Sequence, residues 1–332
     1  MTDAAMGNGG AEPPGVPRGP VRPTAKSVGR YEILGRLGAG GMAEIFRARA
    51  YGPGAYQREL IIKQILPHMD QDPTFIQSFV AEAKILGMLH HPNIVGVYDF
   101  GEDAGRHYLA LEYLDGPSLA EIMGSRERAG NPVPVGIAAH IAHEICQGLT
   151  AVHTLRLPNG APLDVIHRDV TPSNVMTTRA GAVKLLDFGI AKIRHSATLT
   201  RQGQLKGKVA YMAPEQIRGD GFDARVDLFA VGVIMHELLT LKHLFLGQGG
   251  DIAAAYRILE MPIAAPSRHR TDVSRELDGV VMKALARDPA VRFQTAQEMS
   301  DALRPIVDEH RVRREDLVAF IAECAADSPP AV

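Results

Sequence analysis

Three short polar motifs, in one order along the chain, constrain its fold more than any other feature of the sequence. Residues 165–176 read VIHRDVTPSNVM, residues 185–189 read LLDFG, and residues 212–215 read MAPE. One tripeptide arises easily by chance, but three motifs at these separations leave almost no room for that explanation. The first two each follow a short apolar run, so their polar residues are expected in loops at the ends of short strands.

The first two motifs carry the oxygen groups that phosphoryl transfer requires. This chemistry needs a carboxylate to orient the attacking hydroxyl, and it needs oxygen ligands to hold Mg²⁺ on the phosphates. Asp169, Asn174 and Asp187 supply two carboxylates and one amide. We therefore predict a phosphoryl-transfer site built around these three residues.

A glycine-rich turn near the N-terminus fits the same chemistry. Residues 38–45 read GAGGMAEI and lie between two expected strands. Glycines let backbone N–H groups approach phosphate oxygens closely, although a glycine-rich hairpin is more often only a turn. A dinucleotide-binding fold would need a helix directly after the glycines, and a strand follows here, which argues against that fold.

Lys63 and Glu82 are expected to form an ion pair. Lys63 ends an expected strand, where a lysine is usually only solvated. Glu82 borders the apolar face of an expected helix, next to Phe79 and Leu86. A carboxylate in that position is costly unless it is paired, and Lys63 is the evident partner.

The order of expected elements predicts an α+β fold of two lobes. A disordered, Gly- and Pro-rich leader covers residues 1–28, and one domain covers residues 29–305, with a small antiparallel β-rich lobe at 29–113 and a larger helical lobe at 114–305. A C-terminal helix and tail complete the chain at 306–332. Strands are expected at 31–37, 44–50, 59–66, 95–100 and 107–113, and helices at 74–89, 119–127, 135–155, 214–217, 226–240, 252–260, 277–286 and 314–324.

Charge and cysteine content argue against nucleic-acid binding and favour a reducing compartment. The formal net charge is only −2, which does not suggest a nucleic-acid-binding surface. Cys146 and Cys324 are far apart in sequence, which suits a reducing cytoplasm. His140, His143 and Cys146 share a helical face, but no fourth ligand lies nearby, so an ordinary amphipathic helix is favoured over a metal site.

No membrane span is expected. The most apolar stretch, residues 226–241, is short and is interrupted by Asp227, His236 and Glu237. It is better explained as a helix buried inside a large domain. A cytoplasmic protein is therefore expected, and the sequence does not indicate an oligomeric state.

On these motifs the chain resembles the eukaryotic-type Ser/Thr protein kinases of bacteria, over about residues 31–305. The runs GGM at 40–42 and APEQ at 213–216 look bacterial, and the insert before His167 is similar to that of myxobacterial members. The resemblance implies the bilobal protein-kinase fold and the use of ATP with Mg²⁺, or with Mn²⁺ as a substitute. It also implies transfer to Ser or Thr of protein substrates, the chain itself included. Pro172 fits the Ser/Thr pattern better than the Tyr pattern.

The resemblance also implies a role for each matching residue. Asp169 would be the catalytic base, Asn174 and Asp187 would bind Mg²⁺, and Lys63, fixed by Glu82, would hold the α- and β-phosphates. Gly38, Gly40 and Gly41 would cover the phosphates. Adenine would lie among Leu37, Ile45, Ile61, Glu112, Leu114 and Met176.

Supporting roles are implied in the same way. Asp227 would brace the catalytic loop, and Glu215 would pair with Arg292. Leu86, Val97, His167 and Phe188 would form an apolar stack between the lobes. Arg168 would pair with a phosphate on Thr198 or Thr200, although a plain hydroxyl-rich loop is the alternative interpretation of those threonines.

Three positions depart from the family pattern. Ala43 replaces a glycine, Ile61 replaces a small alanine, and Thr171 replaces the lysine that helps to neutralise the γ-phosphate. Lys208, seven residues before Glu215, stands where the family has threonine. We expect Lys208 to supply the missing cation, with the Thr171 hydroxyl as its hydrogen-bond partner. Its ammonium should lie within roughly 4 Å of Asp169 or be hydrogen-bonded to Thr171. In the alternative interpretation, Lys208 is only a solvated lysine.

Two other functions stay open at this stage. A pseudokinase that binds ATP as a scaffold, with little turnover, is one, and Thr171 is its main support. Lys63, Asp169 and Asp187 argue against it, because pseudokinases typically lose one of these groups. A small-molecule phosphotransferase is the other, and the APE motif and the long segment before it argue against that.

Overall fold

The alternating segments near the N-terminus form one antiparallel sheet. In the computed structural model, which describes residues 26–39, 43–188 and 207–326 of the 332-residue chain, the sheet has the order β1-β2-β3-β4-β6-β5. Its strands are β1 (Ser27–Val28), β2 (Tyr31–Ala39), β3 (Ala43–Tyr51), β4 (Gln57–Ile65), β5 (Val97–Asp103) and β6 (Arg106–Glu112), with the short 3₁₀ helix η1 (Pro53–Ala55) between β3 and β4.

The first strand corrects one expectation about the leader. Residues 27 and 28 were assigned to a disordered segment, yet they form β1, which pairs with Tyr31 and Glu32 of β2. The reason is hydrophobic burial, because Val28 packs with Tyr31 and Phe46 in the core on one face of the sheet. The remaining residues of the expected leader, 1–25, lie outside the described part of the chain.

One helix, α1 (Pro73–Met88), completes the small lobe. Asp72 caps its first turn by accepting a hydrogen bond from the backbone N–H of Thr74, and Pro73 occupies a first-turn position that needs no N–H donor. Phe75 and Phe79 are buried in a cluster with Leu109 of β6. The buried face of α1 also carries Glu82, which therefore points where the sheet can supply a partner.

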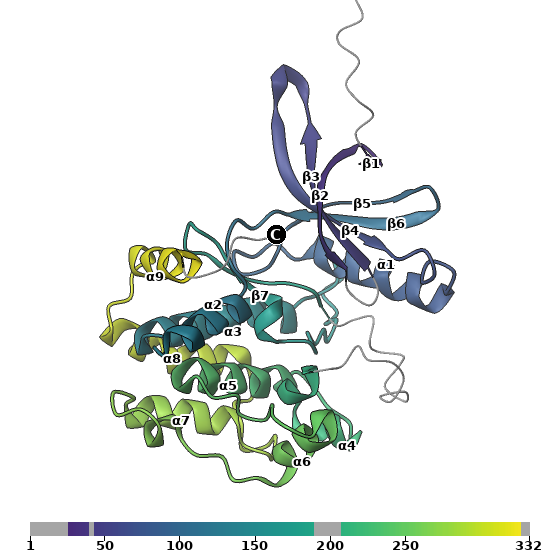
Figure 1. Cartoon of the computed structure of the whole chain (residues 1–332). Coiled ribbons are helices and arrows are strands. Elements are labelled where there is room, and N and C mark those ends of the chain that lie inside the picture. The colour runs from purple at the N-terminus through teal and green to yellow at the C-terminus, as the bar shows by residue number, and fades with distance from the viewer. Residues whose placement is uncertain (1–25, 40–42, 189–206, 327–332) are drawn as a thin grey trace, which may run out of the picture.

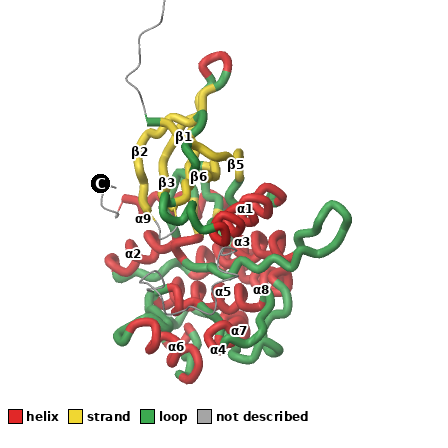
Figure 2. The backbone as a smooth tube through the Cα atoms, turned by 90° about the vertical axis from the view of Figure 1, so that its right-hand side faces the viewer, coloured by secondary structure: helices red, strands yellow, loops and turns green. Residues whose placement is uncertain are grey.

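The larger lobe is helical, as Figures 1 and 2 show. Its helices are α2 (Leu119–Ala129), α3 (Val135–His153), α4 (Pro214–Arg218), α5 (Arg225–Thr240), α6 (Gly250–Glu260), α7 (Arg275–Ala284), α8 (Ala296–Glu309) and α9 (Arg314–Ala326). Between α3 and α4 the described residues include the 3₁₀ helix η2 (Pro172–Asn174), the hairpin of β7 (Val175–Thr177) and β8 (Val183–Leu185), and the 3₁₀ helix η5 (Lys208–Tyr211); η6 (Pro266–Arg268) follows α6.

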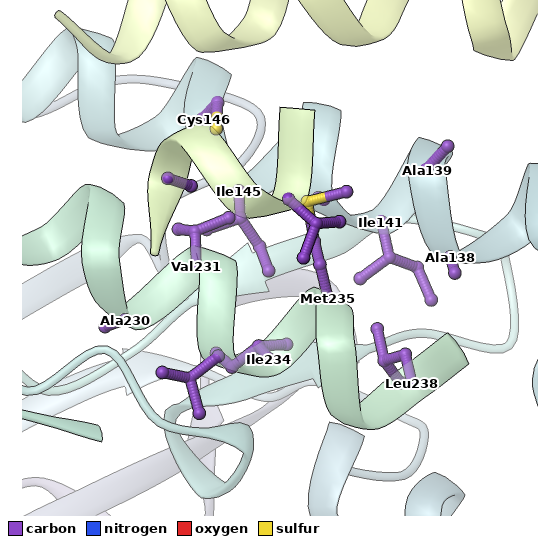
Figure 3. Close-up of a cluster of buried hydrophobic side chains, with 14 of the residues drawn as sticks. Ala138, Ala139, Ile141, Ile145, Cys146, Ala230, Val231, Ile234, Met235 and Leu238 are labelled. Atoms are coloured by element: carbon purple, nitrogen blue, oxygen red, sulfur yellow. The ribbon is translucent and has the colours of Figure 1, made fainter. Parts of the chain in front are cut away.

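Helices α3 and α5 form the centre of this lobe. Figure 3 shows Ile141 and Ile145 of α3 facing Ile234 and Met235 of α5 across the buried cluster. Residues 226–239 of α5 are all buried, which explains the apolar run without a membrane. Within the described part of the chain, no helix combines the length and the apolar character needed to cross a bilayer.

One histidine of α3, His143, contacts another helix of the lobe. The ring nitrogen Nδ1 of His143 lies 2.8 Å from Ser300 Oγ of α8. Cys146 is buried as a free thiol. Among the described residues no group of three His, Cys, Asp or Glu side chains could hold a metal ion.

The C-terminal helices contain the largest miss of the sequence interpretation. Helix α8 was not expected, and the boundary expected at residue 305 falls inside it. Helix α9 continues past α8 and buries Leu317 and Phe320 in the same core as α3 and α5. The segment after residue 305 therefore packs as part of the helical lobe.

Candidate active site

Lys63, on a strand of the small lobe, lies at the centre of a three-residue charge cluster. Its ammonium nitrogen Nζ is 3.0 Å from Glu82 Oε1 of α1 and 2.8 Å from Asp187 Oδ1, after β8. The sheet register pairs Gly38 with Ile45 and Ile45 with Lys63, so the described glycine of the turn and the lysine lie along one row of strands. Lys63 lies within β4, two residues before its end.

Burial and charge act against each other in this cluster. Burial lowers the pKa of Lys63, but the adjacent carboxylates of Asp187 and Glu82 outweigh it and raise that pKa above its usual value. Burial likewise opposes the ionised form of Asp187, and Lys63 nevertheless brings the pKa of Asp187 below its usual value. Burial raises the pKa of Glu82, and Lys63 offsets only part of this rise. Lys63 is therefore a firmly charged group.

A buried aspartate of α5 holds the backbone of the loop that carries Asp169. Asp227 is fully buried, and its two carboxylate oxygens accept hydrogen bonds from the backbone N–H groups of His167, at 2.9 Å, and Arg168, at 2.8 Å. His153 Nε2 lies 2.8 Å from the same carboxylate. Arg168 has a left-handed backbone, with φ of 65°, a strained conformation that this fastening maintains.

Asp169 follows directly and is contacted from two sides. The side-chain amide of Asn174 donates to the backbone oxygen of Asp169 at 2.8 Å and to Oδ2 of its carboxylate at 3.0 Å. The Nζ atom of Lys208, in η5, lies 2.7 Å from the same Oδ2. The loop therefore brings together Asp169 and Asn174, two of the three residues named by the motifs, and the segment before α4 adds a cation.

The donor set fits a magnesium ion. Asn174 uses its amide nitrogen for both hydrogen bonds to Asp169, so its side-chain oxygen is left over as a ligand. Asp187 binds Lys63 through Oδ1, and its side chain is about half exposed. One carboxylate and one amide oxygen, completed by phosphate oxygens, are ligands of the type that Mg²⁺ uses in phosphoryl-transfer sites.

The residues expected around adenine lie at the junction of the lobes. Leu114 is buried, and the partly buried Ile61 and Met176 pack against the same cluster from β4 and β7. Glu112 uses its backbone N–H in a bond to Gly96 O at 2.8 Å. Other residues expected at the nucleotide, Leu37 and Ile45, lie on β2 and β3; Gly40 and Gly41 are outside the described residues, as are Thr198 and Thr200.

Two sets of expected contacts are present: the apolar stack between the lobes and the ion pair of the APE motif. The ring centroids of His167 and Phe188 lie 4.7 Å apart. Leu86 packs in the cluster that contains Phe188. Glu215 and Arg292 form a buried ion pair with two hydrogen bonds, at 2.6 and 2.7 Å. This pair connects the APE motif to the loop between α7 and α8.

One expected contact is wrong. The hydroxyl of Thr171 is buried and has no hydrogen-bond partner among the described residues, so it is not the partner of Lys208. The ammonium of Lys208 instead reaches past Thr171 to the carboxylate of Asp169, where opposite charge gives the stronger interaction.

Sequence reasoning also missed residues that line the hollow beside Asp169. Tyr211 and Gln216 flank the APE motif, which was a usable signal that they lie near the loop. Tyr211 donates its hydroxyl hydrogen to Glu237 Oε2 at 2.8 Å, and Gln216 accepts from the backbone N–H of Ala213 at 2.9 Å. The hollow is lined by Arg168, Asp169, Val170, Thr171, Lys208, Tyr211, Met212, Gln216, Val226, Asp227 and Ala230.

Comparison with known proteins agrees with this geometry. The family model described as "Protein kinase domain" matches residues 31–303. The solved kinase domain of Mycobacterium tuberculosis PknI superposes with a TM-score of 0.63 at 27% identity, covering 86% of this chain and 99% of that one. The chain belongs to the protein kinase domain family.

Two relatives are named for different specificities. The chain is 38% identical over 288 residues to the tyrosine-protein kinase MasK of Myxococcus xanthus strain DK1622, covering 87% of this chain and 44% of that one. It is 39% identical over 281 residues to the serine/threonine-protein kinase PknB of Mycobacterium leprae strain TN, covering 83% and 43%. The chain thus spans less than half the length of these relatives.

Proposed function

We propose that this chain is an ATP-dependent protein kinase that phosphorylates Ser and Thr hydroxyls. The observation that carries the proposal is the proximity of the Lys63–Glu82–Asp187 cluster to the Asp169–Asn174 pair, which is evident because burial and the Asp169 carboxylate both act to raise the pKa of Glu82 and of Asp187. Membership of the protein kinase family supports it. Pro172, in the loop after Asp169, supports Ser and Thr over Tyr. The PknB relative is named a serine/threonine kinase, whereas the MasK relative is named a tyrosine kinase.

In the proposed reaction, Asp169 orients the substrate hydroxyl and accepts its proton. The hydroxyl oxygen forms a bond to the γ-phosphorus, the bond from that phosphorus to the β,γ-bridging oxygen breaks, and ADP leaves with the electron pair. Asn174 supports this step because its amide donates to the Asp169 carboxylate and thereby fixes the rotamer of the base. Asp227 maintains the backbone on which Asp169 stands.

The polyphosphate is assigned to the cluster around Lys63 and to its neighbours. Lys63 would bind the α- and β-phosphates, and Glu82 would keep its ammonium in place. Asn174 and Asp187 would hold Mg²⁺, which would neutralise charge between the β- and γ-phosphates. Gly38, together with Gly40 and Gly41, would cover the phosphates through backbone N–H groups. Ile61, Leu114 and Met176 would enclose adenine, with backbone groups of Glu112 and Leu114 as hydrogen-bond partners.

Phosphorylation of the segment before the APE motif is the proposed means of activation. Arg168 supports this, because its Nε is buried and has no hydrogen-bond partner among the described residues. A phosphate brings almost two negative charges and would pair with that guanidinium. Thr198 and Thr200 are the proposed acceptors. Thr198→Ala/Thr200→Ala should lower activity toward an added substrate, and wild-type activity in that variant would contradict the assignment.

The decisive experiment measures transfer directly. The full chain is incubated with Mg²⁺ and γ-labelled ATP, with and without a generic basic protein as substrate, and phosphorylated residues are located by mass spectrometry. We expect phosphoserine or phosphothreonine in the wild type and none in Asp169→Asn. Phosphotyrosine alone would overturn the specificity. Nucleotide binding without transfer would instead establish the scaffold, the second candidate, which Thr171 favours.

A further inference from the structure

We propose that Lys208 is a catalytic residue of this kinase, the cation that offsets the charge of the transferring γ-phosphoryl group. The inference rests on the proposed kinase function and adds a component to it. Phosphoryl transfer needs positive charge close to the equatorial oxygens of the group in flight. Thr171, on the catalytic loop, is uncharged, so a charge at this side of the site must come from another element.

The position of Lys208 suits this role. Its Nζ lies 2.7 Å from Asp169 Oδ2, the same oxygen that Asn174 contacts from another side at 3.0 Å. An ammonium beside the proposed base is also beside the phosphorus that the substrate hydroxyl attacks. The Lys208 side chain is 39% exposed and lines the hollow next to Asp169. It can therefore contact a phosphate there without losing a buried position.

The surroundings of Thr171 are consistent with a charge supplied from elsewhere. Thr171 is only 6% exposed and lines the same hollow as Lys208. A lysine at position 171 would place a second ammonium against Lys208, and like charges at such a distance repel. The threonine hydroxyl is buried and has no hydrogen-bond partner among the described residues, so it does not hold the Lys208 ammonium.

The segment that carries Lys208 is anchored at both ends. Gly207 has a left-handed backbone, with φ of 89°, and its N–H donates to Asp251 Oδ1 of α6 at 3.4 Å. Lys208 then begins η5, and Tyr211 at its end donates to Glu237 Oε2 of α5 at 2.8 Å. The ammonium therefore comes from a turn with a defined backbone, fixed to two helices of the large lobe.

An ordinary half-exposed ion pair is the competing explanation. Such pairs contribute little to stability, and removing one has little consequence elsewhere. Lys283 offers a matched control, because its Nζ lies 2.6 Å from Glu298 Oε1 and its side chain is 40% exposed. Lys283→Ala removes the same charge from a similar pair on α7, outside the site.

The test compares Lys208→Ala, Lys208→Arg and Lys283→Ala with the wild type, all as the full chain. We expect Lys208→Ala to lower kcat by more than about tenfold, Lys208→Arg to recover part of the loss, and Lys283→Ala to leave kcat unchanged. A second readout is the ratio of the dissociation constants for ADP and ATP. Lys208→Ala should reduce the preference for ATP, since the lost cation contacts the third phosphate only.

The exchanged variant Thr171→Lys/Lys208→Thr supplies a reciprocal test. It should recover much of the activity that Lys208→Ala loses, whereas Thr171→Lys alone should not exceed the wild type. Unchanged kcat and an unchanged ADP-to-ATP ratio in Lys208→Ala would overturn the proposal. A wild type that binds ATP but transfers no phosphate would contradict the kinase function itself, so the two failures are distinguishable.

Discussion

The site contains two lysines that contact aspartates, and their environments differ. Lys63 is 14% exposed and lies between two carboxylates, whereas Lys208 is 39% exposed and contacts one. The first lysine stands on a strand and pairs with a helix across the small lobe. The second comes from a turn of the large lobe. Under the proposed function, Lys63 would have both a structural and a catalytic role, whereas Lys208 would act mainly on the reacting phosphate.

The largest expected effect comes from removing either the ammonium of Lys63 or the carboxylate of Asp169. Lys63→Met and Asp169→Asn should each reduce autophosphorylation by about a thousandfold or more, because one removes the phosphate-binding cation and the other the base. Quantitative mass spectrometry of the incubated chain measures this. Far-ultraviolet circular dichroism checks that each variant is folded. Substantial autophosphorylation by either purified, folded variant would refute the assignment of the site.

Arginine substitutions sharpen the contrast between the two lysines. Lys63→Arg should lose most activity, because the planar guanidinium is larger and cannot fit the compact site between Glu82 and Asp187. Lys208→Arg should keep a larger share, since its side chain faces the hollow. Steady-state kcat for both variants gives the comparison. Equal losses would mean that exposure does not separate the two roles.

Much of this arrangement was predictable from the sequence. Asp169, Asn174 and Asp187 belong to motifs whose order leaves few alternatives, and the pairing of Lys63 with Glu82 followed from the cost of a buried carboxylate. The sheet and most helices followed from periodicity, because one face of each is apolar. The close approach of Lys208 and Asp169 was expected from the exchanged residue types, and the two atoms lie 2.7 Å apart.

Other features depended on tertiary context that local patterns do not contain. Helix α8 includes Pro305, which normally signals the end of a helix, so its turns were not recognised. The strand at Ser27 exists because the sheet has an edge to which it adds. The hydrogen bond expected from Thr171 fails because a carboxylate within reach is a better partner for an ammonium than a hydroxyl is.

A stability measurement tests the structural part of the role of Lys63. Lys63→Met leaves Glu82 buried without its nearest cation, and we expect the free energy of unfolding to fall by about 1–3 kcal/mol. Burial raises the pKa of Glu82. A carboxyl group with a raised pKa stabilises the fold at low pH and loses this contribution as pH rises through its folded value. The deficit should therefore grow as pH rises above the usual pKa of a glutamate, about 4.3.

Urea unfolding of Lys63→Met and of Lys63→Met/Glu82→Gln checks this prediction. The double variant should recover part of the loss and should show a weaker pH dependence, because no buried carboxylate remains at position 82. Lys208→Ala, measured in parallel, should cost much less, as expected for a half-exposed pair. A loss from Lys208→Ala as large as that from Lys63→Met would remove the distinction between the two lysines.

The smallest expected effect concerns the anchor of the Lys208 segment. Glu237 is fully buried and accepts hydrogen bonds from Tyr211 Oη and from the backbone N–H of Leu244. His243 Nδ1 lies 3.5 Å from Glu237 Oε2, and its Nε2 lies 3.5 Å from Glu127 Oε1 of α2. The hydrogen bond to Glu237 raises the pKa of His243 above its usual value, although partial burial opposes this.

This arrangement fixes the sign of a pH effect. A histidine whose folded pKa is raised contributes stability that is complete below its unfolded value, near 6.5, and is lost as pH rises through the higher folded value. The melting temperature of the wild type should therefore exceed that of His243→Gln at about pH 6, and the gap should narrow by about pH 8. Taking this difference cancels the opposite contribution of His236, whose pKa burial lowers. The difference in the ADP-to-ATP affinity ratio between the wild type and His243→Gln should also narrow as pH rises, because Glu237 holds Tyr211 and Tyr211 anchors the turn that carries Lys208. Among the described contacts of the Lys63 cluster, no comparable group acts on Lys63. A gap that widens with pH would show that His243 does not act as a cation beside Glu237.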